Sequence, residues 1–174
     1  MITTINKDIL TVDKGVIVHS VNCIGAVGGL AGAIARKWPE NAEKYKAHVL
    51  CRNQSITLLG TVFDVKVSDN LYVANLFGQY EIGTSERQTE YSALISGLKR
   101  IASTVYTSDE MEEMELGSLG IEDVPKVLQD VYIPYKIGCG LGGGDWNLVE
   151  EIIFSIFSKS VKNAYICKID QPKS

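Results

Sequence analysis

Short apolar stretches alternate along the chain with segments of helical spacing. Stretches rich in Val, Ile, Tyr and Phe predict β-strands. The six predicted strands cover Ile2–Ile5, Val16–Val21, Ile56–Phe63, Leu71–Leu76, Val131–Ile137 and Ala164–Ile169. Several of these stretches have no polar face, which is expected of strands that helices cover on both sides.

Amphipathic spacing predicts helices between these strands. The predicted helices are Ala31–Trp38, Ala42–Cys51, Thr89–Ser103 and Trp146–Ser160, with a further one near Ile121–Gln129. In Trp146–Ser160, residues Leu148, Ile152 and Ile156 recur every four positions and so share one face. This order of elements predicts an α/β fold, a three-layer α/β/α sandwich with a mixed central sheet.

The chain has 174 residues, of which 45% are hydrophobic, and this suits a single domain spanning residues 1–174. The formal net charge of −4 is unevenly distributed. Eight acidic residues and one base, Lys126, lie between Asp109 and Asp130, leaving 13 acidic and 16 basic residues elsewhere. We therefore predict an acidic, solvated insertion or loop around residues 107–130, with Thr107–Gly120 as its most disordered or variable part.

Several classes of protein are disfavoured by composition. No apolar run approaches the ~18 to 20 residues of a membrane span, and Met1–Leu10 lacks the apolar stretch of a signal peptide. We therefore expect a cytoplasmic protein with no membrane partner. The cysteines are widely separated and only two histidines are present, so neither disulfides, nor a metal site, nor a cofactor is predicted. Lys and Arg form no stripe of the kind that binds nucleic acid.

Two glycine-rich segments carry the functional signal. One runs from His19 to Gly32 and the other from Ile137 to Asp145, and each follows a predicted strand and precedes a helix. Glycine lets the backbone approach a ligand and present its N–H groups, and a helix N-terminus favours an anion. Each loop alone could be a flexible connector, but two at the carboxyl ends of strands suit a diphosphate lying between them.

Together the motifs resemble the macrodomain family, in the branch of the yeast-type ADP-ribose-1″-phosphate phosphatase and the terminal ADP-ribose-protein glycohydrolases. The segments that carry this resemblance are Lys7–Leu10, Val16–Asn22, Gly28–Gly32 and Ile133–Leu141. The resemblance implies that Asp8, beside Ile9, accepts from the adenine amino group and that Asn22 holds the distal ribose. The ligand-binding residues it implies are Asp8, Ile9, Asn22, Gly28, Gly29, Leu30, Ala31, Gly32, Ile137, Gly138, Cys139, Gly140, Leu141, Gly142 and Gly143.

Three residues are candidates for catalysis: Asn22, His19 and Asp145. His19 matches a histidine of the phosphatase branch, but strand alternation also permits a hydrogen-bonded core residue. Neighbouring glycohydrolases use a lysine where this chain has Glu86–Thr89 and an aspartate where it has Gly142, so a lysine adduct is not expected. Asp145 could replace that aspartate or could cap the next helix.

Three functions are consistent with these residues. The leading one is a hydrolase that converts ADP-ribose-1″-phosphate to ADP-ribose and phosphate, with Asn22 positioning the ribose and His19 or a water moving the proton. The second is an ADP-ribosyl hydrolase that removes ADP-ribose from protein or nucleic acid. The third is a non-catalytic module that binds ADP-ribose or an NAD-derived signal. In each, the partner is a small-molecule ADP-ribose derivative, with Arg87 expected as a mobile cation near it.

Overall fold

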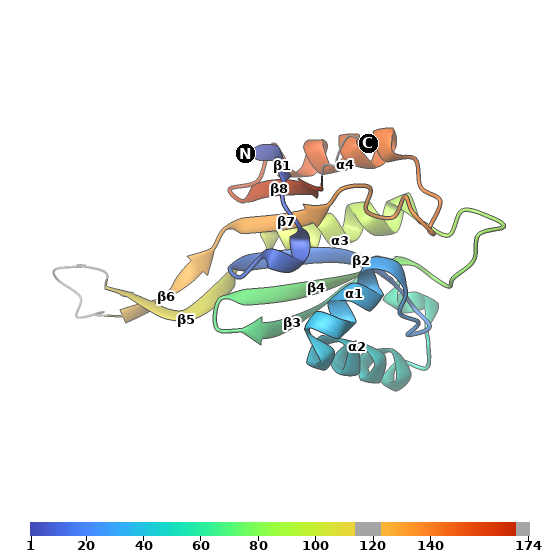
Figure 1. Cartoon of the computed structure of the whole chain (residues 1–174), viewed down its shortest axis with the longest axis horizontal. Helices are drawn as coiled ribbons and strands as arrows, with labels where there is room; N and C mark the ends of the chain where they lie inside the picture. The colour runs from blue at the N-terminus through green and yellow to red at the C-terminus, as the bar shows by residue number, and fades with distance from the viewer. Residues whose placement is uncertain (114–122, 170–174) are drawn as a thin grey trace.

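The computed structural model describes residues 1–113 and 123–169, and it confirms the predicted three-layer α/β/α sandwich (Figure 1). The central sheet has six strands in the order β1-β8-β7-β2-β4-β3. In chain order they are β1 (Ile2–Asn6), β2 (Gly15–Asn22), β3 (Val62–Ser68), β4 (Leu71–Gln79), β7 (Asp130–Pro134) and β8 (Asn163–Lys168). All neighbouring pairs are parallel except β3 and β4, so the sheet is mixed, as predicted.

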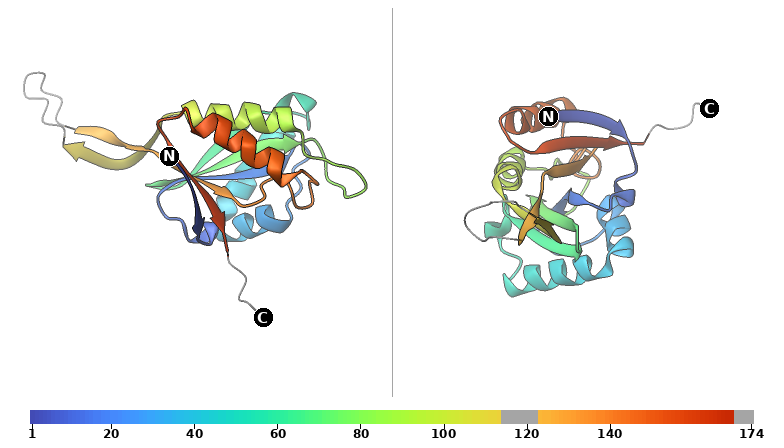
Figure 2. Two further views of the ribbon diagram at one scale, coloured as in Figure 1. Left: turned by 90° about the horizontal axis from the view of Figure 1, so that it is seen from above. Right: turned by 90° about the vertical axis from the view of Figure 1, so that its left-hand side faces the viewer.

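Two pairs of helices cover the two faces of the sheet (Figure 2). They are α1 (Gly29–Lys37) with α2 (Pro39–Cys51), and α3 (Tyr91–Ser103) with α4 (Trp146–Phe157). Leu94 and Leu98 of α3 and Ile153 of α4 are fully buried in the larger core cluster. Tyr45 of α2 and Phe77 of β4 pack in a separate cluster, with their ring centroids 5.9 Å apart. Burial on both faces explains the continuous apolar runs of the central strands.

The predicted strand Ile56–Phe63 is wrong over most of its length. Its first residues form the short 3-10 helix η2 (Ile56–Leu58), which Ser55 caps by accepting a hydrogen bond from the Thr57 N–H at 3.1 Å. The chain turns at Gly60, where φ is +81°, before β3 begins. A second 3-10 helix, η1 (Ile9–Thr11), connects β1 to β2.

The acidic segment around residues 107–130 is not a simple loop. Strands β5 (Tyr106–Glu113) and β6 (Asp123–Leu128) pair antiparallel in a separate sheet, which projects from the body of the molecule (Figure 1). The helix predicted near Ile121–Gln129 is therefore wrong over β6, where Pro125 has no N–H for a helical hydrogen bond. The remainder of Thr107–Gly120, beyond Glu113, lies outside the described residues.

The base of this projecting pair is anchored to the main sheet. The Tyr106 hydroxyl donates to the Asp64 carboxylate at 2.8 Å, and Lys66 of β3 forms an ion pair with Asp109. Leu128, at the end of β6, is buried in the larger core cluster. Over the described ranges, no helix is both long enough and apolar enough to cross a membrane.

Candidate functional site

The order of the strands creates a crevice at the carboxyl ends of β2 and β7. These strands are neighbours, but β2 leads into α1 on one face and β7 leads into α4 on the other. Such a reversal leaves space for a ligand between the diverging loops. A cavity of about 720 Å³ lies here, within the range of small-molecule sites. Its lining residues are His19–Asn22, Ala26–Ala31, Gln79, Ile82–Thr84, Pro134–Gly138 and Gly140–Gly142.

The first glycine-rich loop is held in place by the buried side chain of Asn22. Its Nδ2 donates to the Ala26 carbonyl at 2.8 Å, and its Oδ1 accepts from the N–H groups of Ala26 at 3.0 Å and Ile24 at 3.2 Å. The Tyr45 hydroxyl donates to the Asn22 carbonyl at 2.6 Å. Asn22 therefore shapes the loop, and one Nδ2 hydrogen remains beyond the bond to Ala26.

The start of α1 is open toward an anionic ligand. Its N-cap residue, Gly28, supplies no side-chain acceptor to the first turn. Side chains built at Gly28, Gly29 and Gly140 would meet no atom within 4 Å at Cβ, so the backbone of both loops is accessible there. Since N–H groups at a helix start point along the axis and carry partial positive charge, this wall of the cavity suits phosphate.

The second glycine-rich loop is fixed by Thr89, a residue that sequence reasoning missed. The Thr89 side chain is fully buried, and its hydroxyl donates to the Gly138 carbonyl at 2.6 Å. The Thr89 N–H donates to the Gly142 carbonyl at 3.0 Å. A Cβ at Gly142 would collide with the Thr89 hydroxyl and lie 2.8 Å from the Gly138 oxygen. Gly142 is therefore required for packing rather than for access.

His19 lies at the cavity and is almost completely buried. Its Nε2 is 2.8 Å from the Asn75 Oδ1, whereas its Nδ1 has no hydrogen-bond partner in the described structure. Burial lowers the pKa of His19 to about 4, an effect that the hydrogen bond to Asn75 partly opposes. The imidazole is thus neutral at physiological pH, and it is both a core residue and part of the cavity wall.

The remaining predicted site residues divide into two groups. Those that line the cavity are Gly28, Gly29, Leu30, Ala31, Ile137, Gly138, Gly140, Leu141 and Gly142. Those outside its lining are Asp8, Ile9, Gly32, Cys139, Gly143 and Asp145. The Asp8 carboxylate caps η1 by accepting from the Leu10 N–H at 2.9 Å, and Ile9 is buried in the core.

Asp145 is the N-cap of α4, which confirms the capping interpretation. Its carboxylate accepts from the Asn147 N–H at 3.0 Å, and its own N–H donates to the Tyr91 hydroxyl at 2.9 Å. Trp146 packs edge-on against the Tyr135 ring at a centroid distance of 4.9 Å. The start of α4 therefore contacts Tyr135, a residue that lines the cavity.

Lys136 is the one Lys or Arg among the described residues that line the cavity, and its Nζ lies 5.5 Å from the centroid of the Tyr135 ring. Arg87, the cation that the sequence predicts near the ligand, is not part of this lining. Arg87 instead stacks over the Tyr91 ring at 4.5 Å. Lys136 is exposed and has a φ of +61°, a conformation that non-glycine residues rarely adopt outside functional or tightly turned segments. Its place just before the Ile-Gly-Cys-Gly run was visible in the sequence, but the direction of its side chain was not.

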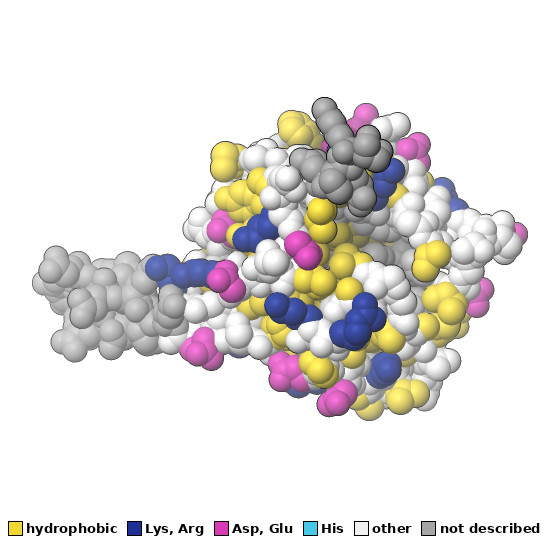
Figure 3. Space-filling view, in the orientation of Figure 1, with side chains coloured by type: hydrophobic (Ala, Val, Ile, Leu, Met, Phe, Trp, Pro, Cys, Tyr) yellow, Lys and Arg dark blue, Asp and Glu magenta, His cyan; other side chains and the backbone are white. Residues whose placement is uncertain are grey.

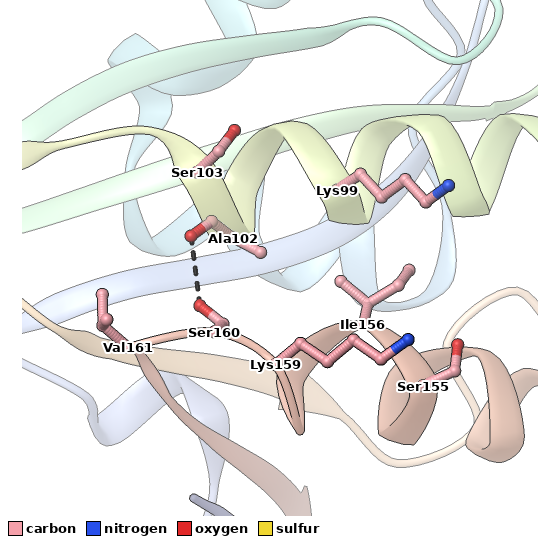
Figure 4. A pocket seen from close by; sticks show the side chains of 8 residues that line it. All are labelled: Lys99, Ala102, Ser103, Ser155, Ile156, Lys159, Ser160 and Val161. Atoms are coloured by element: carbon pink, nitrogen blue, oxygen red, sulfur yellow. Dashed lines mark hydrogen bonds between the residues drawn. The ribbon is translucent and has the colours of Figure 1, made fainter.

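A second, smaller hollow of about 510 Å³ lies between the carboxyl ends of α3 and α4 (Figure 4). Lys99 and Lys159 flank it, and the Ser160 hydroxyl donates across it to the Ala102 carbonyl at 3.1 Å. It contains neither glycine-rich loop nor a helix N-terminus. We therefore assign the candidate ligand site to the cavity between β2 and β7.

Three further findings concern metal-ligating clusters, surface charge and the cysteines. In the part of the chain that the structure describes, no cluster of three or more His, Cys, Asp or Glu residues could hold a metal ion. On the face shown in Figure 3, Lys and Arg are interspersed with acidic side chains rather than gathered in one stripe. The four cysteines are free thiols, with Cys23 and Cys167 buried.

Comparison with known proteins places this architecture. No protein-family model matches the chain. An uncharacterised 17.5 kDa protein from the tk-vs intergenic region of Enterobacteria phage T4 is 28% identical over 147 residues, covering 82% of this chain and 80% of that protein. A Bacteroides thetaiotaomicron structure of unknown function is 29% identical, with a TM-score of 0.70 and coverage of 97% of this chain and 98% of that one.

The macrodomain of Mycobacterium tuberculosis DarG superposes with a TM-score of 0.70 at 23% identity, covering 97% of this chain and 98% of that one. The fold is that of a macrodomain. Thermosipho africanus DarTG, solved in complex with ADP-ribose, matches 98% of this chain and 42% of its own length, at 16% identity and a TM-score of 0.68. The chain shares this fold with structures that are 16% to 29% identical in sequence, so its ligand must be argued from its own cavity.

Proposed function

We propose that this macrodomain binds ADP-ribose or a close derivative in the cavity between β2 and β7, with the diphosphate lying between the two glycine-rich loops. The observation that carries this proposal is the accessible backbone of Gly28, Gly29 and Gly140 around one cavity at a reversal of strand order. Lys136 adds a positive charge to the lining. The ADP-ribose bound to the structurally similar DarTG supports the same ligand class.

We further propose hydrolysis of ADP-ribose-1″-phosphate to ADP-ribose and phosphate. A water oxygen attacks phosphorus, the bond from phosphorus to the ribose oxygen breaks, and one proton of the attacking water ends on that oxygen while the other stays on the phosphate. The remaining Nδ2 hydrogen of Asn22 would hold a distal ribose hydroxyl, and Lys136 would offset phosphate charge. Positioning of substrate and water supplies the rate enhancement in this scheme.

A non-catalytic binding module is the second candidate, and one observation favours it. The described residues that line the cavity include no carboxylate that could act as a general base. Asp145 is engaged at the start of α4, and the Nε2 of His19 is engaged by Asn75. A cavity that has ligand-binding loops but no general base in its described lining suits a protein that binds ADP-ribose without converting it.

Calorimetry and turnover assays on the same protein separate these proposals. Titration with ADP-ribose should show one site, with AMP binding more weakly because it lacks the second phosphate and the distal ribose. Absence of heat at about 1 mM ligand, which corresponds to only ~4 kcal/mol of binding free energy, would refute ADP-ribose binding.

The turnover assay supplies ADP-ribose-1″-phosphate, ADP-ribosylated protein and ADP-ribosylated DNA separately. Release of phosphate from the first substrate alone is the expected result. Release of ADP-ribose from a macromolecule would instead establish an ADP-ribosyl hydrolase. Binding without conversion of any of the three would establish the binding module.

A further inference from the structure

Three buried amide and imidazole groups form a chain of hydrogen bonds behind the cavity. The Nε2 of His19 lies 2.8 Å from the Oδ1 of Asn75, a fully buried residue of β4. Asn75 and Asn41 of α2 exchange two bonds, because the Nδ2 of Asn75 donates to the Oδ1 of Asn41 at 2.8 Å and the return bond measures 3.2 Å. The Nδ2 of Asn75 also donates to the Phe63 carbonyl at 2.9 Å.

These bonds determine which nitrogen of His19 carries the proton. Both hydrogens of the Asn75 amide are used by Asn41 and Phe63, so the amide cannot be turned around without losing two bonds. Its oxygen therefore faces His19, and an amide oxygen only accepts. The Nε2 of His19 must then be the N–H donor, and in a neutral imidazole the Nδ1 is left as a pure acceptor.

The Nδ1 of His19 is the ring nitrogen that is not bonded to Asn75, and His19 is one of the residues that line the cavity. The Nε2 is directed toward β4, and the other neighbour of β2 is β7, whose loop lines the cavity. His19 itself is part of that lining, together with Leu30 and Ala31 of α1. The Nδ1 is buried and has no partner in the described structure. A buried acceptor without a donor is unfavourable, so a ligand that donates a hydrogen bond to the Nδ1 gains binding free energy.

We propose that the Nδ1 of His19 accepts a hydrogen bond from a ribose hydroxyl of the bound ligand, and that Asn75 is the positioning residue that fixes the required tautomer. This inference rests on the proposed binding of ADP-ribose or a derivative. It assigns His19 to recognition of the sugar rather than to proton transfer. It also excludes phosphate from this position, because phosphate oxygens and the Nδ1 lone pair are both acceptors.

Nitrogen NMR on the whole protein tests the tautomer directly. The chain has only two histidines, so a His48→Gln variant assigns the imidazole signals of His19. In the free protein the Nε2 should be protonated and the Nδ1 unprotonated. On saturation with ADP-ribose, the Nδ1 resonance should shift toward the hydrogen-bonded value while the Nε2 resonance stays nearly constant. A protonated Nδ1 in the free protein would overturn the inference.

Two substitutions of His19 separate its two nitrogens. His19→Gln places an amide near the Nε2 position and removes the Nδ1 acceptor, whereas His19→Asn keeps a polar atom near the Nδ1 position. Calorimetry should show ADP-ribose affinity about 2- to 10-fold weaker for His19→Gln, the range expected for one neutral hydrogen bond, and a smaller loss for His19→Asn. Equal affinity of His19→Gln and the parent would overturn the proposed contact.

Asn75→Asp tests the positioning role. A carboxylate beside the Nε2 stabilises the doubly protonated imidazolium, so the Nδ1 becomes a donor and can no longer accept a hydrogen bond from the ribose hydroxyl. The expected result is a His19 that stays doubly protonated in the free and the ADP-ribose-bound protein, in a variant whose circular dichroism matches that of the parent. An unchanged neutral tautomer in this variant would remove Asn75 from the role, and if the variant does not fold, the spectrum of the free parent decides the tautomer.

The same measurements distinguish failure of this inference from failure of the proposed function. ADP-ribose that binds to the parent by calorimetry without shifting the Nδ1 resonance refutes the contact and leaves the proposed function intact. A parent that does not bind ADP-ribose refutes the proposed function, and the contact with it. The tautomer assigned to His19 is judged in either case from the spectrum of the free protein.

Discussion

Replacement of Asn22 by alanine should destabilise the fold and weaken ligand binding through the same loop. The side chain makes three hydrogen bonds to the backbone of Ile24 and Ala26. At about 0.5–1.5 kcal/mol for each neutral bond, the loss of all three amounts to about 1.5–4.5 kcal/mol. Because Ile24 and Ala26 are partly exposed, water can replace some of these bonds, and we expect a loss near 2 kcal/mol.

Chemical and thermal unfolding measure this loss. For a domain of this size, about 2 kcal/mol corresponds to a decrease in Tm of roughly 4–8 °C. ADP-ribose affinity should fall by more than tenfold, since binding must then also order the released loop. If the hydrolysis proposal holds, turnover should fall further than affinity, because a ribose that is no longer held by Asn22 is misplaced for reaction.

Tyr45→Phe is the matched control. It removes the hydroxyl that donates to the Asn22 carbonyl at 2.6 Å and to its Oδ1 at 3.1 Å, but it leaves the three loop bonds. Stability should fall by about 1 kcal/mol, with affinity unchanged within about twofold. An Asn22→Ala protein that is as stable as the parent would refute the structural account of the loop, as would equal losses of affinity in the two variants.

Two glycines and one histidine give the remaining predictions. Gly140→Glu should fold like the parent but show no ADP-ribose binding by calorimetry, because the added carboxylate enters open space at the cavity. Gly142→Ala should lower the free energy of unfolding in urea by about 1–3 kcal/mol, because the added Cβ collides with Thr89. Since the pKa of His19 is lowered to about 4 from 6.5, the unfolded chain takes up the proton first, and stability should decrease as pH falls from 6.5 to 4. At pH 4 the resulting loss in the free energy of unfolding amounts to roughly 3 kcal/mol. Urea titrations from pH 7 to pH 4 should show a smaller loss of stability for His19→Gln, which lacks the imidazole.

The fold was predictable where local pattern and tertiary environment agree. The apolar run of β2 is buried on both faces, so its sequence could belong only to a central strand or a buried helix, and its length favoured the strand. β3 was misplaced because it is an edge strand in which Asp64 and Lys66 make specific polar contacts with the projecting pair. Those partners lie more than forty positions away, where periodicity carries no information.

The candidate site was predictable only in part, for the same reason. The two glycine-rich loops follow strands, so their positions at the sheet edge could be inferred from the chain alone. The groups that hold these loops could not. Thr89 is 49 positions from Gly138, and Asn75 is 56 positions from His19. Thr89 and Asn75 have no neighbours in sequence that mark them as polar residues of the site.

Glycine content alone overestimates the number of residues available to a ligand. At Gly28 and Gly140 the space beside the backbone is empty, whereas at Gly142 it is occupied by Thr89 and the Gly138 carbonyl. Gly97 is of the second kind, since a Cβ there would collide with Leu76 and separate α3 from β4. Glycines of the second kind bring α3 and the second loop close to the sheet. The accessible backbone of the first kind then faces a cavity of fixed shape, which is why substitutions of the two kinds should affect binding and stability separately.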